Sequence, residues 1–393
     1  MSPHIAFLFS QVLTIPPSWT NNREYYASFE LLRRGHKITW VTRIPSKQVS
    51  PKEKIIVLNL GRGKSKVGFS ILSFFHLYRF LLKSKVDIVW ICGYYSRSIL
   101  NLLLLMCILK FLRKKIIYDP IDPIIIYKIA SSELKEDTLK ERMLRFLMRR
   151  IYQFADLVLA VTEEMKEILV RRGVDGKKIH AVYCGTDKTR FNLSVDGSSI
   201  RKEFGLESKF VIGWIGSMSP FKGVSEIVIP LIKRLKLSVP EAFFLIGGRG
   251  PLQEEFVKLK KDDLEAPFIY LGTIPYDLTP LYTNAFDLYI IPLNTQFEFT
   301  RSVLPAKLFD ALATGTPTLV TLTPATQRLS RTFQSMTLVE DNPEAFEKAI
   351  VKIKKDYEKI KLLAIQDAKK MDAYTAQNSG DRVSDLIERL LSI

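Results

Sequence analysis

One stretch, SVLPAKLFDALATGTPTLV from Ser302 to Val320, predicts a helix that opens onto a ligand and then leads into a buried strand. Pro305 suits the first turn of a helix, because its missing N–H would have no partner there. Gly315 and Pro317 end the helix, and the β-branched run TPTLV is typical of a core strand. The free N–H groups of such a first turn can hold a phosphate.

Helical spacing sorts the side chains of this segment onto two faces. The apolar face comprises Leu304, Leu308, Ala311 and Leu312, and the polar face comprises Lys307, Asp310 and Thr314. The Asp310 carboxylate can accept hydrogen bonds from the hydroxyls of a sugar. The same pattern also describes an ordinary amphipathic helix with a solvated i,i+3 pair of Lys307 and Asp310, so both interpretations stay open.

Three upstream segments each run from an apolar strand into a polar or glycine-rich loop. They are FVIGWIGSMSPFKG from Phe210, AFFLIGGRGP from Ala242 and LYIIPL from Leu288. In a parallel α/β sheet such loops meet at the carboxyl edge, where ligands bind. Lys222 and Arg249 lie in two of these loops, and we expect both cations at that edge.

Four segments, GSMSPFKG, LIGGRGP, YLGTIP and LPAKLFDALATGTPTLV, occur in the order and spacing of the carboxyl half of family 4 glycosyltransferases, which this chain resembles. The amino half agrees, with IAFLF at the start and LLRRGHKITWVTR near residue 40. It continues with ADLVLAVTEEMKEIL and then VYCGTDKTRF near residue 185. The resemblance implies a retaining enzyme of the GT-B fold that uses a nucleotide-sugar donor.

Alternating strands and helices predict an α/β fold. The resemblance implies GT-B architecture, with two doubly wound Rossmann-like domains facing a cleft. We expect an amino-terminal acceptor-binding domain over residues 1–195 and a carboxy-terminal nucleotide-sugar-binding domain over residues 209–372. The polar stretch between Phe191 and Lys209 marks the change of domain. A last helix, at about residues 374–393, is expected to pack back on the amino-terminal domain.

Breaking a sugar–diphosphate bond requires stabilising the charge that builds on the departing phosphate, which fixed cations and oriented amides can do without a metal. Lys222 is our first candidate for this catalytic role, with Arg249 as a helper. Asp310 is the candidate for the ribose contact, and the backbone at Thr273 and Ile274 for the base. The donor-binding residues that the resemblance implies are Gly216, Ser217, Lys222, Arg249, Gly250, Thr273, Ile274, Val303, Leu304, Lys307 and Asp310. Plainer alternatives are solvated turn residues at Lys222 and Arg249, and an ordinary strand exit at Thr273.

The chain departs from the family pattern at several positions. Ser302 and Asp310 stand where the family often has two glutamates, so one carboxylate is lost and the other is one methylene shorter. Ser217 replaces an arginine that is common beside the first glycine. In IIYDPIDPI, Asp119 and Asp122 stand where a catalytic histidine region is expected, and Asp122 is the catalytic candidate there. An Asp-Pro turn after a strand accounts equally well for both aspartates.

The composition is that of a globular protein, and the chain of 393 residues is long enough for two domains. Its three cysteines are scattered and its four histidines form no metal pair, so we expect neither a metal nor another cofactor. The start, MSPHIAFLFSQVL, lacks a basic region and runs straight into a strand. We therefore expect no secretion signal and a cytoplasmic protein.

The net charge of +17 is unevenly spread, with a basic stretch between Gly61 and Lys115. The apolar run from residue 99 to 112 is shorter than the ~20 residues that span a bilayer, so it either packs against the sheet or lies in a membrane interface. A second basic and apolar segment is LKERMLRFLMRRI, from Leu139 to Ile151. Without any nucleic-acid-binding signature, we expect no nucleic acid but an anionic membrane surface as a partner, on the inner face of the cell membrane.

These observations predict a hexosyltransferase that moves a sugar from a nucleotide-diphosphate donor to a hydroxyl of a lipid-linked or polysaccharide acceptor. Two alternatives stay open. A GT-B nucleotide-sugar epimerase would share the fold and the phosphate loops, and would turn over free donor without an acceptor. A non-catalytic scaffold would account for Ser302 and Ser217, and would bind a nucleotide sugar without transferring it.

Overall fold

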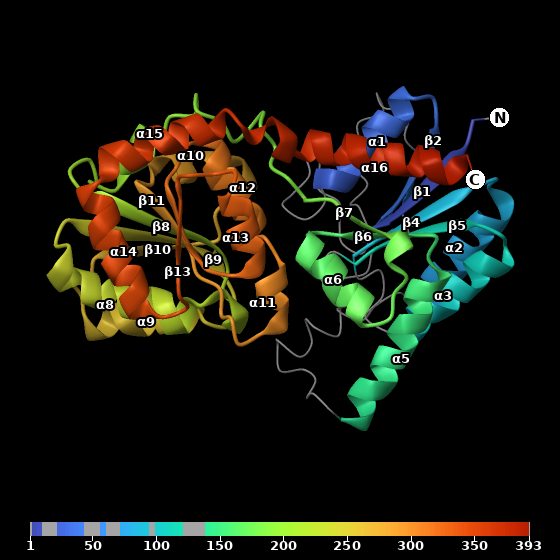
Figure 1. Ribbon diagram of the computed structural model, residues 1–393, viewed down its shortest axis with the longest axis horizontal. Helices are drawn as coiled ribbons and strands as arrows, with labels where there is room; N and C mark the ends of the chain where they lie inside the picture. The colour runs from blue at the N-terminus through green and yellow to red at the C-terminus, as the bar shows by residue number, and fades with distance from the viewer. Residues whose placement is uncertain are drawn as a thin grey trace. The chain divides into compact units, whose positions relative to one another are not determined.

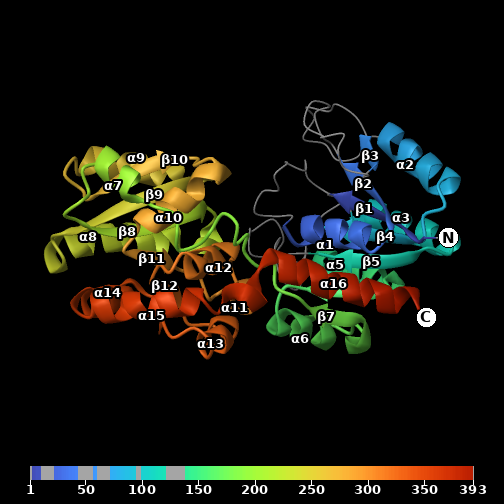
Figure 2. The same cartoon turned by 90° about the horizontal axis from the view of Figure 1, so that it is seen from above.

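Two parallel α/β units make up the chain. The computed structural model describes residues 2–9, 22–42, 56–59, 71–93, 99–120 and 138–392. The first unit comprises Met1–Cys184 together with Ala376–Ile393, and the second comprises Gly185–Thr375. Each unit has one sheet with helices on both faces (Figures 1 and 2).

The sheet of the first unit has the strand order β3-β2-β1-β4-β5-β6-β7 over the residues described, and its strands pair in parallel. Its strands are β1 (His4–Phe9), β2 (Lys37–Thr42), β3 (Ile56–Asn59), β4 (Ile88–Cys92), β5 (Lys115–Asp119), β6 (Leu157–Ala160) and β7 (Ile179–Ala181). Its helices are α1 (Asn22–Arg33), α2 (Ile71–Lys83), α3 (Ile99–Phe111), α5 (Leu139–Phe154), α6 (Glu163–Arg171) and α16 (Ala376–Leu391).

The strands of this unit form near-continuous apolar runs because helices bury both faces of the sheet. On one face, Ala27 of α1 and Val383 of α16 share a core cluster with Phe7 of β1. On the other face, the Tyr118 and Tyr152 rings of β5 and α5 lie with their centroids 5.4 Å apart. The last helix of the chain therefore completes the core of the first unit.

The sheet of the second unit has the order β10-β9-β8-β11-β12-β13, also parallel. Its strands are β8 (Phe210–Ser217), β9 (Ala242–Arg249), β10 (Phe268–Gly272), β11 (Leu288–Ile291), β12 (Thr318–Thr321) and β13 (Met336–Val339). Its helices are α7 (Ser198–Glu203), α8 (Ile229–Ser238), α9 (Gln253–Asp262), α10 (Thr279–Ala285), α11 (Glu298–Ser302), α12 (Ala306–Ala313), α13 (Pro324–Ser330), α14 (Pro343–Lys355) and α15 (Tyr357–Ala368).

The connections of the second sheet fix where a ligand can bind. Its strand order reverses between β8 and β11, because the chain runs outward to one side from β8 and to the other side from β11. In such a sheet the loops at the carboxyl ends of the two central strands separate and leave a crevice. The loops after Ser217 and Ile291 therefore flank the binding crevice that this topology creates.

The division between the units lies earlier than the sequence analysis placed it. We expected residues up to 195 in the amino-terminal domain, whereas the chain enters the second unit at Gly185. The residues just beyond that point bind second-unit elements. Thr186 donates to Asp310 at 2.6 Å, and Arg190 forms an ion pair with Asp277 at 2.5 Å. Thr186 and Arg190 thus contact the second unit, although they precede the polar stretch that was expected to mark the change of domain.

Candidate functional site

The carboxyl ends of β8 and β9 come into unusually close backbone contact. Ser217 pairs with Arg249 at the end of the ladder. Gly248 has a φ of +145°, and a Cβ there would lie 1.8 Å from the carbonyl oxygen of Gly216. Only glycine fits this position. The Arg249 side chain is exposed at this edge, and Gly250 follows it directly.

Lys222 lies in a short 3₁₀ turn, Pro220–Lys222, that follows β8. Its Nζ is 5.2 Å from the centroid of the Phe221 ring, which is buried against Phe299. The carbonyl of Phe221 also accepts a hydrogen bond from the backbone N–H of Asn294 at 3.2 Å. These contacts join the Lys222 turn to the loop after β11, so the half-buried lysine lies at the crevice between the two central strands.

Lys307 is a buried cation on the first turn of α12, with an exposed fraction of 8%. Its Nζ donates to the carbonyl of Ile215 at 2.8 Å and lies 4.5 Å from the centroid of the Trp214 ring. A Cβ at Gly216 would come within 2.6 Å of that nitrogen. The ammonium therefore lies against the backbone at the end of β8.

Burial and the nearby charge of Lys222 lower the pKa of Lys307 well below its ordinary value. Lys307 is the buried member of the pair and Lys222 the half-buried one, and both burial and a neighbouring cation favour the neutral form of an amine. An anion bound at Gly216 would interact with Lys307 and Lys222 and relieve their repulsion. Of the predicted donor-binding residues, Lys307 lies directly against Gly216, and Lys222 is close enough for its charge to act on Lys307.

Asp310 lies on α12 but not on a solvated face, which corrects the amphipathic pattern expected for this helix. Its exposed fraction is 4%, and every residue from Lys307 to Ala313 is buried. Its Oδ1 accepts a hydrogen bond from the Thr186 hydroxyl at 2.6 Å. Burial raises the pKa of Asp310 to about 7, with a further contribution from the charge of Asp187 against the lowering effect of the Thr186 bond.

Two residues that the sequence analysis did not select lie beside these groups. Thr186 belongs to VYCGTDKTRF, which served only as evidence of resemblance, and its partner Asp310 lies 124 residues away, so no local pattern pointed to it. Tyr289 of β11 is fully buried, and its hydroxyl donates to the same Ile215 carbonyl at 3.3 Å. Because Tyr289 lies inside an apolar strand, the sequence did not indicate that its hydroxyl would bond to the end of β8.

The other predicted donor contacts lie around the same edge. Val303 is buried and Leu304 half-buried just before α12, whereas Ser302 is buried and donates its hydroxyl to Phe299 at 2.9 Å. Thr273 is exposed after β10, and Ile274 packs against Gly247 of the neighbouring strand. The structure thus puts these residues next to the phosphate loops, and their contacts with a donor stay predictions.

Asp119, a candidate in the amino-terminal half, is a buried partner of Arg23. Both of its carboxylate oxygens accept from Arg23 Nη2 at 2.6 Å, and Arg23 Nη1 donates to the carbonyl of Val182 at 2.5 Å. Burial and the Asp119 charge raise the pKa of Glu24 to about 8. These bonds hold α1 to the end of β5 and to the residue that follows β7, so Asp119 acts in the core. Asp122 lies outside the described residues.

No group of three or more His, Cys, Asp or Glu side chains within the described ranges is placed to hold a metal ion. The expectation of a metal-free site stays a prediction.

Comparison with known proteins agrees with this geometry. The sequence model of Glycosyltransferase Family 4 matches residues 25–190, and that of Glycosyl transferases group 1 matches residues 209–356. The chain is 26% identical over 270 residues to chitobiosyldiphosphodolichol beta-mannosyltransferase of Kluyveromyces lactis. That match covers 62% of this chain and 59%, less than two thirds, of the Kluyveromyces protein.

Two solved structures share the fold. Alr3699/HepE of Anabaena, solved in complex with UDP, has a TM-score of 0.72 at 15% identity, covering 99% of this chain and 100% of that one. Sucrose-phosphate synthase of Thermosynechococcus elongatus has a TM-score of 0.76 at 15% identity, covering both chains fully. The two Rossmann-like units and the loops at the end of β8 and β9 define a GT-B protein. The chain belongs to glycosyltransferase family 4.

Asp310→Asn should make the stability of the protein less dependent on pH. The pKa of about 7 in the folded protein lies above the ordinary 3.8, so folding binds this proton more tightly. The contribution of Asp310 is fully present below pH 3.8 and is lost as the pH rises through 7, amounting to roughly 2–4 kcal/mol. Asparagine does not titrate and can still accept from Thr186.

The measurement is the free energy of urea unfolding of both ligand-free proteins between about pH 4 and 8. The stability of the variant relative to the wild type should rise across this range. The exposed Asp372 offers the control, since Asp372→Asn should leave the wild-type pH profile nearly unchanged. If the free energies of unfolding of Asp310→Asn and of the wild type change with pH in parallel, the raised pKa assigned to Asp310 is contradicted.

Proposed function

We propose that the chain transfers a sugar from a nucleoside-diphosphate sugar to a hydroxyl group of a lipid-linked or polysaccharide acceptor, with retention of configuration. The observation that carries the proposal is the buried Lys307 amine against the backbone of Ile215 and Gly216, with the charge of Lys222 acting on it, at the crevice between β8 and β11. Cations and free backbone groups at this place suit a diphosphate. The family membership agrees with a nucleotide sugar as donor.

In this proposal the diphosphate of the donor lies against Gly216, and Lys222 and Lys307 stabilise the charge that develops as the sugar leaves. Preorganised cations are most effective in a site that excludes water, because no solvent has to reorganise during the reaction. Arg249, exposed at the same edge, contacts the phosphates from the other side. Asp310 accepts a ribose hydroxyl through Oδ2, since Thr186 bonds to Oδ1.

The support for the acceptor class and for the retaining course comes from relatives of the chain and not from the geometry of the site. The Kluyveromyces relative is named for mannosyl transfer to a diphosphodolichol-linked acceptor, which favours a lipid-linked acceptor here. Retention follows the expectation from the family, and the anomeric configuration of the product, read by NMR, tests it. Donor turnover without acceptor would favour an epimerase, and donor binding without any turnover would favour a scaffold.

Lys222→Ala tests the transfer proposal directly. Loss of one preorganised cation should reduce kcat/KM by a factor corresponding to roughly 2–4 kcal/mol. Donors are first identified by the rise in melting temperature that a panel of UDP- and GDP-sugars produces. Transfer to lipid-linked and polysaccharide acceptors is then measured for both proteins. Lys355→Ala, at an exposed position of α14, serves as the control, and near-normal turnover by Lys222→Ala would remove Lys222 from the mechanism.

Donor binding should be accompanied by uptake of a proton at Lys307. The pKa of Lys307 is lowered by burial and by Lys222, and a bound diphosphate opposes both effects. Titration calorimetry with UDP and GDP in buffers of different ionisation enthalpy measures this uptake, at most about one proton per nucleotide. It should disappear in Lys307→Met. Binding heats that are the same in every buffer would contradict the assignment.

We also propose that the protein works as a peripheral protein on the cytoplasmic face of the membrane. Helices α3 and α5 pack against each other in the first unit (Figure 1). Each carries a line of exposed apolar side chains at helical spacing: Leu100, Leu104 and Phe111 on α3, and Leu139, Met143 and Phe146 on α5. Phe111 and Leu139 are each 85% exposed. None of the helices in the described part of the chain is long and apolar enough to cross a membrane.

Basic residues accompany the apolar line of α5, which is the arrangement of a helix that lies in a lipid interface. Arg142, Arg149 and Arg150 are exposed, and the Arg150 guanidinium lies 5.3 Å from the centroid of the Phe146 ring. Arg145 differs, because it pairs with the buried Glu141 and its loss would leave that carboxylate alone in the core. Arg145 is therefore unsuitable for testing the surface.

Replacing Arg142, Arg149 and Arg150 with Gln should weaken binding to anionic vesicles, by about 1 kcal/mol for each well-placed arginine. Binding should fall with salt, whereas the apolar part of the interaction is not screened. Co-sedimentation with phosphatidylglycerol and phosphatidylcholine vesicles at low and high salt measures the electrostatic and the apolar parts of the binding. The control replaces Lys352, Lys355 and Lys359, exposed on the second unit, and removes the same charge. A wild-type protein that stays in the supernatant at low salt would refute the membrane proposal.

A further inference from the structure

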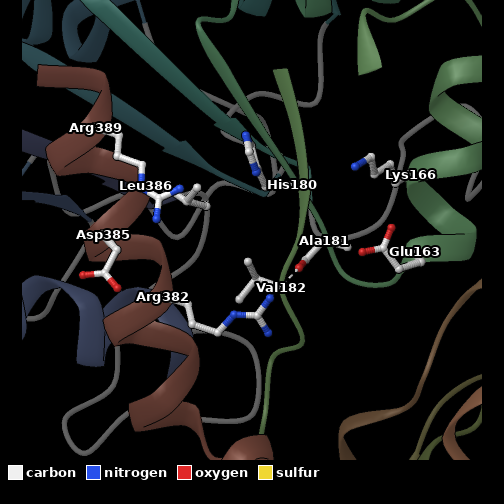
Figure 3. A pocket seen from close by; sticks show the side chains of 9 residues that line it. All are labelled: Glu163, Lys166, His180, Ala181, Val182, Arg382, Asp385, Leu386 and Arg389. Carbon is white, nitrogen blue, oxygen red and sulfur yellow. Dashed lines mark hydrogen bonds between the residues drawn. The ribbon is translucent and has the colours of Figure 1, made fainter. Parts of the chain in front are cut away.

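The first unit has a pocket of its own, of about 290 Å³, between α6, β7 and α16. It is lined by Glu163, Lys166, His180, Ala181, Val182, Arg382, Asp385, Leu386 and Arg389 (Figure 3). All of these residues belong to the first unit, whereas Lys222, Lys307 and Asp310 belong to the second. The pocket is therefore separate from the proposed donor site.

The chain builds this pocket from an edge strand and two helices. Strand β7 is the last strand of its sheet among the residues described, so within them one of its edges carries no further strand. Ile179 is buried, and the next residue, His180, points to the other side and is only half-buried. On α16, Arg382 and Arg389 are seven residues apart and so lie on the same face. His180 lies between Arg389 and Lys166 of α6, as Figure 3 shows.

The positive charges of the pocket are not neutralised within it. Lys166, Arg382 and Arg389 form no ion pair with any residue that the structure describes, and Arg382 makes only a long bond of 3.5 Å to the Ala181 carbonyl. Of the two acids in the lining, Asp385 is already paired with Arg34 at 2.8 Å. Glu163 is left as the one acid facing three cations from two helices. The pocket thus has an excess of positive charge.

The electrostatics of His180 agree with this arrangement. Burial, Lys166 and Arg389 lower the pKa of His180, and Glu163 raises it. The cations of α6 and α16 therefore act on the same imidazole from both sides. Three cations that face a single unpaired acid repel one another, and a bound anion relieves that repulsion.

We propose that this pocket binds the phosphate group of a small ligand. Arg382 and Arg389 offer planar guanidinium groups, which suit the oxygens of a phosphate, and Lys166 adds a point charge from the opposite side. Val182 and Leu386 give the lining an apolar part for the remainder of the ligand. The volume lies near the lower end of the range for small-molecule sites.

A ligand here would join two segments that are distant in sequence. Strand β7 leads to Cys184, where the chain leaves the first unit, and α16 begins at Ala376, where it returns. A phosphate held by Lys166 and by Arg382 would fasten α16 to α6 across the edge of the sheet. Occupancy should therefore also raise the melting temperature of the protein.

The imidazole of His180 gives a local readout of binding. The chain has four histidines, and the spectrum of His180→Gln identifies the His180 signal. The ring C2 proton is followed by NMR while inorganic phosphate or pyrophosphate replaces chloride at constant ionic strength. We expect a saturable shift of that signal and a rise in the pKa of His180, because the anion offsets the charges of Lys166 and Arg389. Glu163 and Asp385 face the same pocket, and their carboxyl groups disfavour the approach of an anion.

Variants separate this site from any other phosphate site. The double variant Arg382→Gln, Arg389→Gln should weaken the saturable shift at least about tenfold, equivalent to the loss of about 1.4 kcal/mol of binding. Lys166→Gln, on the other helix, should weaken it as well, which guards against a double variant that loses its fold. The matched control Lys177→Gln, Lys355→Gln removes two exposed lysines outside the pocket and should bind as the wild type does.

The source of the phosphate is decided by a second titration. If a lipid headgroup is the ligand, vesicles of phosphatidic acid in phosphatidylcholine should displace inorganic phosphate from the pocket. The His180 signal would then no longer respond to added phosphate. If the vesicles do not displace it, a soluble phosphorylated compound is the ligand. A His180 signal that does not respond to phosphate or pyrophosphate, or that responds equally in the wild type and in both pocket variants, would overturn the proposal. Neither result bears on the donor site, which lies in the other unit.

Discussion

A buried ammonium group, that of Lys307, organises the proposed donor site. Its hydrogen bond to the Ile215 carbonyl joins α12 to the carboxyl end of β8, next to the glycines that bring β8 and β9 together. Burying an amine is unfavourable by several kcal/mol unless it is paired, and here the compensation comes from one carbonyl and the face of Trp214. Lys307 has no acidic partner within the described residues, so no carboxylate would compete with a bound anion for this amine.

The same burial determines the behaviour of Asp310, one turn further along α12. Sequence spacing permits an i,i+3 pair between Lys307 and Asp310, but the two side chains reach different partners. Lys307 bonds to the end of β8, and Asp310 accepts from Thr186. Lack of solvent then moves the two pKa values in opposite directions, down for the amine and up for the carboxyl. Each group is thus kept closer to neutrality in the empty protein than it would be in water.

The fold could be predicted from the sequence because it depends on local patterns. Parallel strands that are covered on both faces appear as short apolar runs, and the loops that follow them carry the glycines and cations of the site. The residues whose roles the sequence did not predict depend instead on contacts between distant segments. Asp119 binds Arg23 at a separation of 96 residues, and Thr186 binds Asp310 at a separation of 124. No local pattern reports such pairs, so Asp119 looked like a site residue and Thr186 like a loop residue. The pocket beside His180 is built from α6, β7 and α16. The last of these is far from the other two in the sequence, so no local pattern predicted the pocket.

The cations of the pocket beside His180 and the cation of the proposed donor site differ in how far they are buried. Arg382 and Arg389 keep part of their hydration, so their charge adds little to the free energy of unfolding in either direction. Lys307 is different, because a methionine of similar length would fill its place without the desolvation penalty and would still cover Trp214. Folding stability alone therefore gives no reason for a lysine there. The proposed donor gives one, since a cation at the end of β8 acts on an anion bound against Gly216.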